Sequence, residues 1–469
     1  MPVLHMPVAC ARPTTLFLVV WLTGCAAPLP YQPAPLDLPA ARAAFAARDL
    51  DDAALQAFMR SAGATPPAAD ASWTRQTLAL AAAWFSPALA VAQARWAAAL
   101  AQRTQSLQPA GAVLAAGLDH NDLVDGGRTS PWALGLGFEF TLPSPARRSA
   151  RTLMADAEVE QARLALAEVA WQVQQAVAQA WVDAQVAQAR HALWLRRWHL
   201  QQAMQAATQQ QVAQGVRSPA ELTNAVRQAE EVRLLEMQAS AELAARMQAL
   251  RSAAALPAGK GAERSIALPP LPDNFDAPAS AMAQQLALDN RLDLQLARAQ
   301  FLRADGALQL AVAQQYPELT LHPGYEWDQG DHRLRIGIAL PVRLPDAHPA
   351  AIALAEAERS AQAQAALAVQ ASVLQDVDRA LAALDRAEQQ RAQQAALQQT
   401  RVRGLQDAQT AVRLGAADQN DQRLAEIEVV QGQLQALDLQ AASAQALLQL
   451  QAALHLPVDP KQTQRSSPE

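Results

Sequence analysis

Short runs in which apolar and polar or small residues alternate occur in both halves of the chain. From Trp132 to Phe140 every second residue is large and apolar, and Ala, Gly and Glu lie between them. The same parity returns 200 residues later, where large apolar residues alternate with Arg, Gly and Ala. Alternation of period two predicts a strand with one apolar face. We predict strands at about 112–118, 132–142, 318–327 and 333–342.

Long stretches without glycine or proline follow the strand pairs. The first runs from Arg148 to Gln214, and at 1.5 Å per residue a helix of that length reaches roughly 100 Å. Gly215 ends it, and a second helical stretch returns to Leu256. We therefore predict a tall helical hairpin after each pair of strands.

The two halves of the chain follow one plan, displaced by 200 residues. Gly215 matches Gly415, and Leu256-Pro257 matches Leu456-Pro457. Self-similarity at a fixed offset indicates a structural repeat. The predicted segments are a signal peptide (1–24), an N-terminal tether (25–71), a first repeat (72–257), a linker (258–277), a second repeat (278–457) and a tail (458–469).

Turn and capping residues support these boundaries. Ser86-Pro87 interrupts the first helical segment of the first repeat. Gly215 and Gly415 lie where a helix commonly ends in a left-handed residue. Ser218-Pro219-Ala220-Glu221 is a capping box with proline at the first helical position, and Asp418 can cap the equivalent helix. Both hairpin turns therefore carry their own start and stop signals.

The chain begins with a short apolar run that ends in Leu22-Thr23-Gly24-Cys25. The run is too short to span a bilayer, and its end resembles a bacterial lipobox, in which the cysteine is lipidated and becomes the new N-terminus. We predict that Cys25 carries a lipid and that Cys10 is removed with the signal peptide. Ala26 favours the outer membrane. The alternative is a buried structural cysteine.

Composition narrows the class of protein. The 469 residues carry a formal net charge of −6, and only 4% of them are aromatic. The acidic balance argues against nucleic acid as a partner, and abundant Ala with few aromatics favours long helices packed side by side. No phosphate loop, catalytic carboxylate pair or nucleophile motif stands out. We therefore expect no enzyme and no cofactor other than the lipid on Cys25.

The strands have the pattern of membrane strands. Four strands are too few to close a barrel, and an open sheet edge cannot lie in lipid. Because bacterial barrels use even numbers of strands from eight upward, four strands per chain imply an oligomer. A soluble sheet packed under the helices is the alternative. The residues predicted to face lipid are Trp132, Leu134, Leu136, Phe138, Leu334, Ile336 and Ile338, with Tyr325 and Trp327 joining Trp132 in an aromatic belt.

The tandem repeat, the Ser86-Pro87 break, the strand-to-helix passages at Phe140-Thr141-Leu142-Pro143 and Leu340-Pro341-Val342 and the glycine-centred turns together resemble TolC-like outer-membrane efflux proteins, in particular the lipid-anchored, NodT-type branch. The resemblance covers about residues 72–457. It implies a mainly helical fold with a small membrane sheet. Three chains would form a twelve-stranded β-barrel continuous with an α-helical barrel.

The resemblance also implies a function and partners. The chain would be the passive exit duct of a tripartite efflux system, with a periplasmic adaptor and an inner-membrane pump of the resistance-nodulation-division type. The second passage, Arg343-Leu344-Pro345-Asp346, departs from the apolar-Gly turn common in the family. So does Ala417, where the family often has arginine. Residues predicted at the periplasmic aperture and adaptor-docking end are Gly215, Arg217, Glu221, Arg413, Gly415, Asp418 and Asp421.

Other functions fit less of the sequence. A periplasmic adaptor or scaffolding lipoprotein also uses long helical hairpins, but it would carry one hairpin flanked by soluble β-domains. A metal site at His191 and His199 lacks a cysteine or an acidic cluster to complete it, so we assign both to a helix surface. We read the loop from Glu326 to His332 as a solvated hairpin tip.

Overall fold

The computed structural model divides the chain into two units, residues up to Ala47 and residues from Arg48 onward. The first unit contains α2 (Leu38–Ala46), whose N-cap Asp37 accepts a hydrogen bond from the amide of Ala40 at 2.9 Å. The structure describes residues 32–68, 72–109, 111–120, 130–142, 144–257, 266–271, 278–328, 330–340 and 348–456. Cys25, the passage at 341–347 and the tail from 457 lie outside these residues.

The second unit has the predicted order of elements twice. Helix α3 (Ala53–Ser61) comes first, and the elements of the first repeat are then α4 (Arg75–Phe85), α5 (Pro87–Ser106), β1 (Val113–His120), β2 (Trp132–Leu142), α6 (Pro145–Ala213) and α7 (Pro219–Ala253). Those of the second are α8 (Ser280–Asn290), α9 (Leu292–Ala313), β3 (Leu319–Asp328), β4 (Asp331–Ala339), α10 (His348–Arg413) and α11 (Gln419–Leu454). Strands and long helices lie close to their predicted positions.

The first helical segment of each repeat is broken, once at a predicted position and once at a position that was not predicted. The predicted break at Ser86-Pro87 is present, with a bend of 54° between α4 and α5. The second repeat also begins with a broken helical segment, because Arg291 adopts an extended conformation between α8 and α9. No proline or glycine marks this second break, so the pattern alone did not indicate it.

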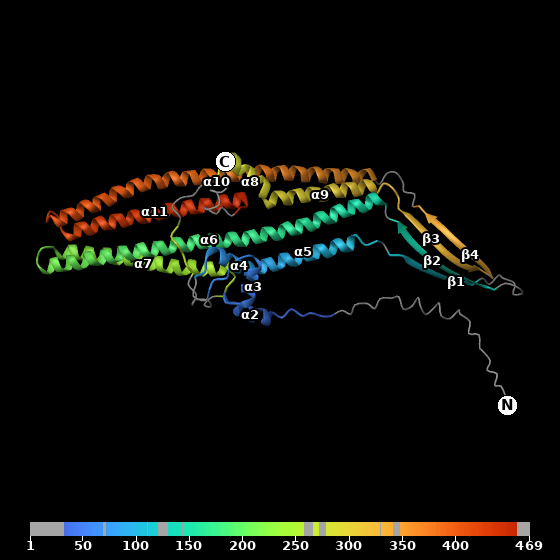
Figure 1. Cartoon of the computed structure of the whole chain (residues 1–469), viewed down its shortest axis with the longest axis horizontal. Coiled ribbons are helices and arrows are strands. Elements are labelled where there is room, and N and C mark those ends of the chain that lie inside the picture. Colours follow the sequence, from blue (N-terminus) through green and yellow to red (C-terminus); the bar gives the residue numbers. More distant parts are fainter. Residues whose placement is uncertain are drawn as a thin grey trace, which may run out of the picture. The chain divides into compact units, whose positions relative to one another are not determined.

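The long helices α6 and α10 organise the second unit (Figure 1). Helices α5 and α7 lie along α6. Helices α9 and α11 lie along α10, and both also contact α6. The sheet lies at one end of these helices, and the turns after α6 and α10 lie at the other. Two short helices placed one after the other therefore match the length of one long helix.

The four described strands form one antiparallel sheet in the order β1-β2-β3-β4. Within each repeat the strands form a neighbouring pair, and β2 pairs with β3 to join the two repeats. The ladder between β2 and β3 ends at Leu142, opposite Leu319. One sheet thus draws its two halves from distant parts of the chain.

The repeat extends to unusual backbone conformations. Gly215 and Gly415 both have φ of +73°, as a left-handed helix end requires. Ala255 and His455, also 200 residues apart, have φ of 55° and 49°. A left-handed residue other than glycine costs about 1–2 kcal/mol, so both repeats retain the same strained helix end.

Helix α3 belongs to a buried core although it falls in the predicted tether. Leu55 and Met59 on α3 are fully buried and pack in one cluster with Trp73 of the same unit. Trp73 in turn forms a parallel bridge to Ile266. The interpretation of residues 25–71 as one tether did not include this helix or α2.

No single helix among the described residues has both the length and the apolar character needed to cross a bilayer; only the bent pair α4 and α5 satisfies the test jointly.

Candidate functional site

One face of the sheet is an exposed apolar surface. In the strand register Leu136 lies opposite Ala116 on one side and Tyr325 on the other, and Tyr325 lies opposite Leu334. Directly paired residues of antiparallel strands project from the same face. All the residues predicted to face lipid therefore share one face. Leu334 and Ile336 are 87% and 83% exposed.

We call this surface the apolar sheet face. Its members are Leu114, Leu118, Trp132, Leu134, Leu136, Phe138, Phe140, Leu142, Leu319, Leu321, Tyr325, Trp327, Leu334, Ile336 and Ile338. An exposed apolar patch of this extent on a protein marks an interaction surface.

The opposite face of the sheet is polar and rich in glycine. Arg335 forms an ion pair with Glu326 at 2.5 Å, and Arg333 forms one with Asp328 at 2.8 Å. Gly135 lies opposite both Gly117 and Glu326 in the register. Glycine in strands permits tight curvature. The sheet thus has one apolar face and one polar face.

Aromatic and histidine side chains gather near the hairpin end of the apolar sheet face. His120 packs edge-on against Trp132, with ring centroids 4.5 Å apart. Trp327 lies opposite both Leu134 and His332 in the register, and the Tyr325 hydroxyl is hydrogen-bonded to Nδ1 of His332. Trp and Tyr at one level of a strand sheet are typical of a membrane interface.

The edges of the sheet are open. In the described strands β1 pairs only with β2, and β4 pairs only with β3. Each edge therefore presents unpaired backbone N–H and C=O groups. Because its apolar face is exposed and the outer edges of its described strands are unpaired, the sheet has room for further strands beside β1 and β4.

At the opposite end of the helices, both turns are built by the same backbone hydrogen bonds. The amide of Val216 donates to the carbonyl of Gln211 at 2.8 Å, and that of Ala416 donates to Ala411 at 2.8 Å. These six-to-one bonds, together with Gly215 and Gly415, define Schellman motifs. The hairpin turns of the two repeats therefore have the same geometry.

The predicted aperture residues mostly serve their own turns. Glu221 accepts a hydrogen bond from the Ser218 amide at 2.8 Å and lies 3.7 Å from Arg217. Asp421 accepts from the Asp418 amide at 3.0 Å. In the part of the chain that the structure describes, no ion pair joins the two turns. The single chain thus shows helix caps at both carboxylates.

The capping arrangement affects the acidity of Glu221. The hydrogen bond from the Ser218 amide, with a second from its hydroxyl and the charge of Arg217, lowers the pKa of Glu221. Glu221 therefore stabilises its cap above the usual pKa of glutamate, and this contribution is lost as the pH falls through the lowered value. The cap remains ionised at neutral pH.

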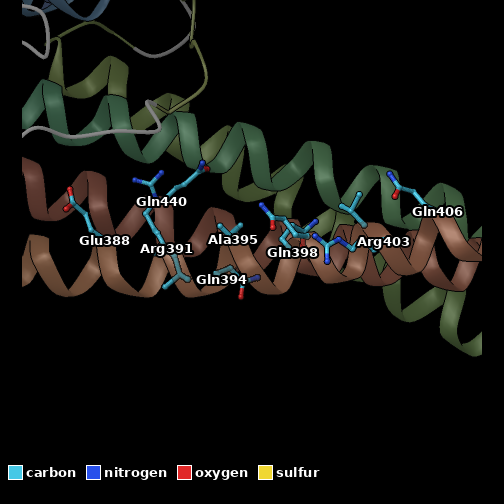
Figure 2. A pocket seen from close by; sticks show the side chains of 13 residues that line it. Glu388, Arg391, Gln394, Ala395, Gln398, Arg403, Gln406 and Gln440 are labelled. Atoms are coloured by element: carbon cyan, nitrogen blue, oxygen red, sulfur yellow. The ribbon is translucent and has the colours of Figure 1, made fainter.

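A groove lies on the hairpin of α10 and α11 between the turn and the middle of the helices. Figure 2 shows it lined by side chains of α10, with Gln440 contributed by α11. Its volume is about 970 Å³. Gln394 and Gln398 donate to backbone carbonyls of α11 at Gly432 and Val429, at 3.1 and 3.2 Å. The sequence analysis did not single out this surface.

Three arginines missed by the sequence analysis connect elements of the second unit. Arg147 contacts the end of α9, and Arg291 bonds to Asp293 at 2.5 Å and lies 3.4 Å from Asp376. Arg190 pairs with α7 and α11, 2.9 Å from Asp438. Single arginines in helical sequence carry no motif, so only spatial proximity reveals these roles.

The histidines set aside as surface residues differ from each other. Nε2 of His191 on α6 lies 3.3 Å from the carboxylate of Glu236 on α7, and Glu236 is buried. His199 is exposed. Among the residues that the structure describes, no group of three or more His, Cys, Asp or Glu side chains could hold a metal ion.

Solved structures share this arrangement. VceC, an outer membrane protein from Vibrio cholerae, is 18% identical and superposes with a TM-score of 0.66 over 82% of this chain and 97% of its own. The CmeC outer membrane channel of Campylobacter jejuni is 14% identical, with a TM-score of 0.64 over 81% of this chain and 85% of its own. MtrE, an outer membrane channel of Neisseria gonorrhoeae, is 19% identical, with a TM-score of 0.61 over 81% of this chain and 89% of its own.

The chain has the TolC-like fold. The predicted mainly helical fold with a small antiparallel sheet is therefore confirmed. No protein-family model matches the sequence, and no curated protein matches it either. In the TolC-like fold of this chain, the sheet with its apolar face and the turns of the two hairpins occupy opposite ends of the long helices.

Proposed function

We propose that the chain is the outer-membrane channel of a tripartite efflux system, a passive exit duct for small molecules or secreted products. The apolar sheet face carries this proposal, because a lipid environment accounts for the largely exposed Leu334, Ile336 and Ile338 at alternate positions of β4. β2 has 11 residues, and at about 3.3 Å per residue with a tilt of about 45° it spans an apolar band of about 25 Å.

A trimer would complete the sheet. The open edges of β1 and β4 must find partners inside lipid, where an unpaired backbone group costs several kcal/mol. Pairing β1 of one chain with β4 of the next closes a barrel, and three chains give twelve strands. The polar face with its arginine–carboxylate pairs would then line a water-filled lumen.

The partners follow from the other end of the molecule. A periplasmic adaptor would contact the turns near Gly215 and Gly415, and the groove on α10 and α11 offers amide and guanidinium groups to a polar helix. The inner-membrane pump, of the resistance-nodulation-division type, would select the cargo. Similarity of fold to outer-membrane channels supports this assignment.

Two measurements test the proposal. Outer-membrane extracts are run with and without heating, and the chain should migrate as a trimer that heating dissociates. The purified trimer is then added to a planar bilayer, where we expect steady single-channel conductance. A monomer without conductance that still fractionates with the membrane would instead favour the scaffolding lipoprotein.

We further propose that Cys25 anchors the mature chain through its lipid. The lipobox residues support this, and Cys25→Ser should abolish incorporation of labelled palmitate. Cys10→Ser is the matched control and should leave labelling unchanged, because Cys10 would be removed with the signal peptide. Full labelling of the Cys25 variant would contradict the lipobox assignment.

At the aperture, we propose that three copies of Asp421 form a negative collar, with contacts to Arg217 or Arg413 of a neighbouring chain. The double variant Glu221→Ala/Asp421→Ala should raise single-channel conductance, because it removes the charge-assisted contacts that would hold the mouth narrow, and it should weaken cation preference, because it removes negative charge there. Circular dichroism should show intact helices. Glu231→Ala, on the exposed surface of α7, is the control.

Unchanged conductance and selectivity in the double variant would mean that these carboxylates only cap helices. The gate would then lie elsewhere along the duct.

A further inference from the structure

A duct needs a continuous wall at the point where the sheet ends and the helices begin. Backbone pairing between β2 and β3 ends at Leu142 and Leu319. Residues 314–318, which connect α9 to β3, lie beyond this ladder and have no strand partner there. Their carbonyls need donors from another source if the wall between α6 and α9 is to stay closed.

Arg147 supplies those donors. Its Nε donates to the carbonyl of Ala313 at 3.3 Å, and Nη2 donates to that of Gln314 at 3.4 Å and to that of Tyr316. Nη1 lies 3.0 Å from Oε1 of Glu318. The Arg147 side chain is only 8% exposed. One guanidinium therefore serves three carbonyls and a carboxylate of a single passage.

The position of Arg147 is unfavourable for its own helix, so its charge is expected to serve another part of the chain. Arg147 lies in the first turn of α6, where the helix dipole disfavours a cation. Its backbone amide donates to the N-cap Ser144 at 3.2 Å, and its guanidinium reaches the C-terminal end of α9, where a cation is favoured. The charge thus acts across the boundary between the repeats.

The neighbouring contact between α6 and α9 is equally close. A Cβ added at Gly306 would lie 2.8 Å from Cγ of Met154 and 3.4 Å from the carbonyl of Ala150. The repeat does not duplicate this arrangement, because the residue 200 positions after Arg147 is Ala347. Arg147 is therefore specific to the junction between the two halves of one chain.

We propose that Arg147 is a positioning residue that seals the seam between the two repeats where the barrel meets the helical tunnel. The guanidinium holds residues 313–318 against the start of α6, so that the wall stays closed without strand pairing. The sealing role rests on the proposed function, whereas the positioning of the passage does not.

The test uses the full chain, purified and assembled, with three variants. Arg147→Met keeps the length of the side chain but removes all donors, and Arg147→Lys keeps the charge without the fork. Arg303→Met is the matched control, because Arg303 also joins α9 to α6, 2.9 Å from Glu158, but farther from the sheet.

Hydrogen exchange over residues 314–322 is the first measurement. Arg147→Met should speed exchange there by roughly tenfold or more, because the carbonyls of Ala313, Gln314 and Tyr316 lose the donor that holds them. Exchange in α10 and α11 should not change. Arg147→Lys should give an intermediate rate, and Arg303→Met the wild-type rate. Wild-type exchange in Arg147→Met, or an equal increase in every helix, would overturn the proposal.

Planar-bilayer recording is the second measurement. Wild-type channels should be steady, and Arg147→Met channels should show added leak conductance that Arg147→Lys partly suppresses. If the wild type conducts and Arg147→Met channels are as steady as the wild type, the sealing role is wrong while the duct function stands. If the wild type fails to conduct, the duct function is wrong, and hydrogen exchange alone decides the positioning role.

Discussion

Replacing Leu136 or Ile336 by arginine is expected to block assembly of the trimer in the outer membrane. Both residues lie on the apolar sheet face, and Ile336 is 83% exposed in the single chain. An arginine facing lipid near the bilayer midplane costs about 2–4 kcal/mol, and three chains carry it at once. The measurement is the fraction of heat-modifiable trimer in outer-membrane extracts.

Gly137→Arg is the control for Leu136→Arg, because it adds the same charge one residue along β2 on the polar face. A Cβ at Gly137 meets nothing closer than the carbonyl of Pro323 at 3.7 Å. Gly337 is a poorer control, since a Cβ there would lie 3.3 Å from Cβ of His322. Equal loss of trimer in the Leu136 and Gly137 variants would exclude the membrane orientation.

Removing the charge of Arg291 should destabilise the chain by about 1–3 kcal/mol, because the largely buried guanidinium loses several hydrogen bonds while its two carboxylate partners remain more than a third exposed to solvent. The Arg291 side chain is 12% exposed and joins Asp293, Asp376 and the carbonyl of Ala453. Arg291→Met would leave two carboxylates without their shared cation. Urea unfolding of the detergent-purified protein measures the change.

Arg379→Met is the matched control, because Arg379 pairs with the same Asp376 at 3.6 Å but is 73% exposed. An exposed pair of this kind contributes about 0–1 kcal/mol. The double variant Arg291→Met/Asp293→Asn should recover part of the loss, since it removes one unpaired charge. Equal effects of the Arg291 and Arg379 variants would contradict the role assigned to Arg291.

The Arg291 cluster also predicts a pH dependence. Burial alone would raise the pKa of Asp293, but the hydrogen bond and charge of Arg291 outweigh it and lower the pKa below the usual aspartate value. Asp293 therefore stabilises the fold above that usual value, and the contribution is lost as the pH falls through the lowered one. Asp293→Asn should remove this part of the acid sensitivity.

Much of the fold was predictable because it rests on patterns that are local and repeated. The period-two alternation from Trp132 to Phe140 identified β2 and its exposed face. The glycines at 215 and 415 identified the two hairpin turns, and the 200-residue offset related the two halves. The alternation and the offset are visible in the sequence itself, and the glycines mark a left-handed backbone conformation that few other residues adopt.

The remaining features depend on contacts between distant segments. The break at Arg291 has no proline or glycine to mark it, and the contact of its guanidinium with Asp376 of α10 joins residues 85 positions apart. Nothing near Arg147 in the sequence indicates that it reaches the end of α9. At the turns the sequence allowed two roles for Glu221 and Asp421, and the single chain shows the capping contacts.

Pairing between β2 and β3 has a consequence for how the chain is made. The two strands come from opposite halves of the sequence, so under the proposed outer-membrane function β2 cannot find its partner until most of the chain has left the secretion pore. Pairing of such high contact order is slow and leaves apolar strands exposed to aggregation. Holding by a periplasmic chaperone during this interval, rather than the stability of the finished trimer, is then expected to limit the yield.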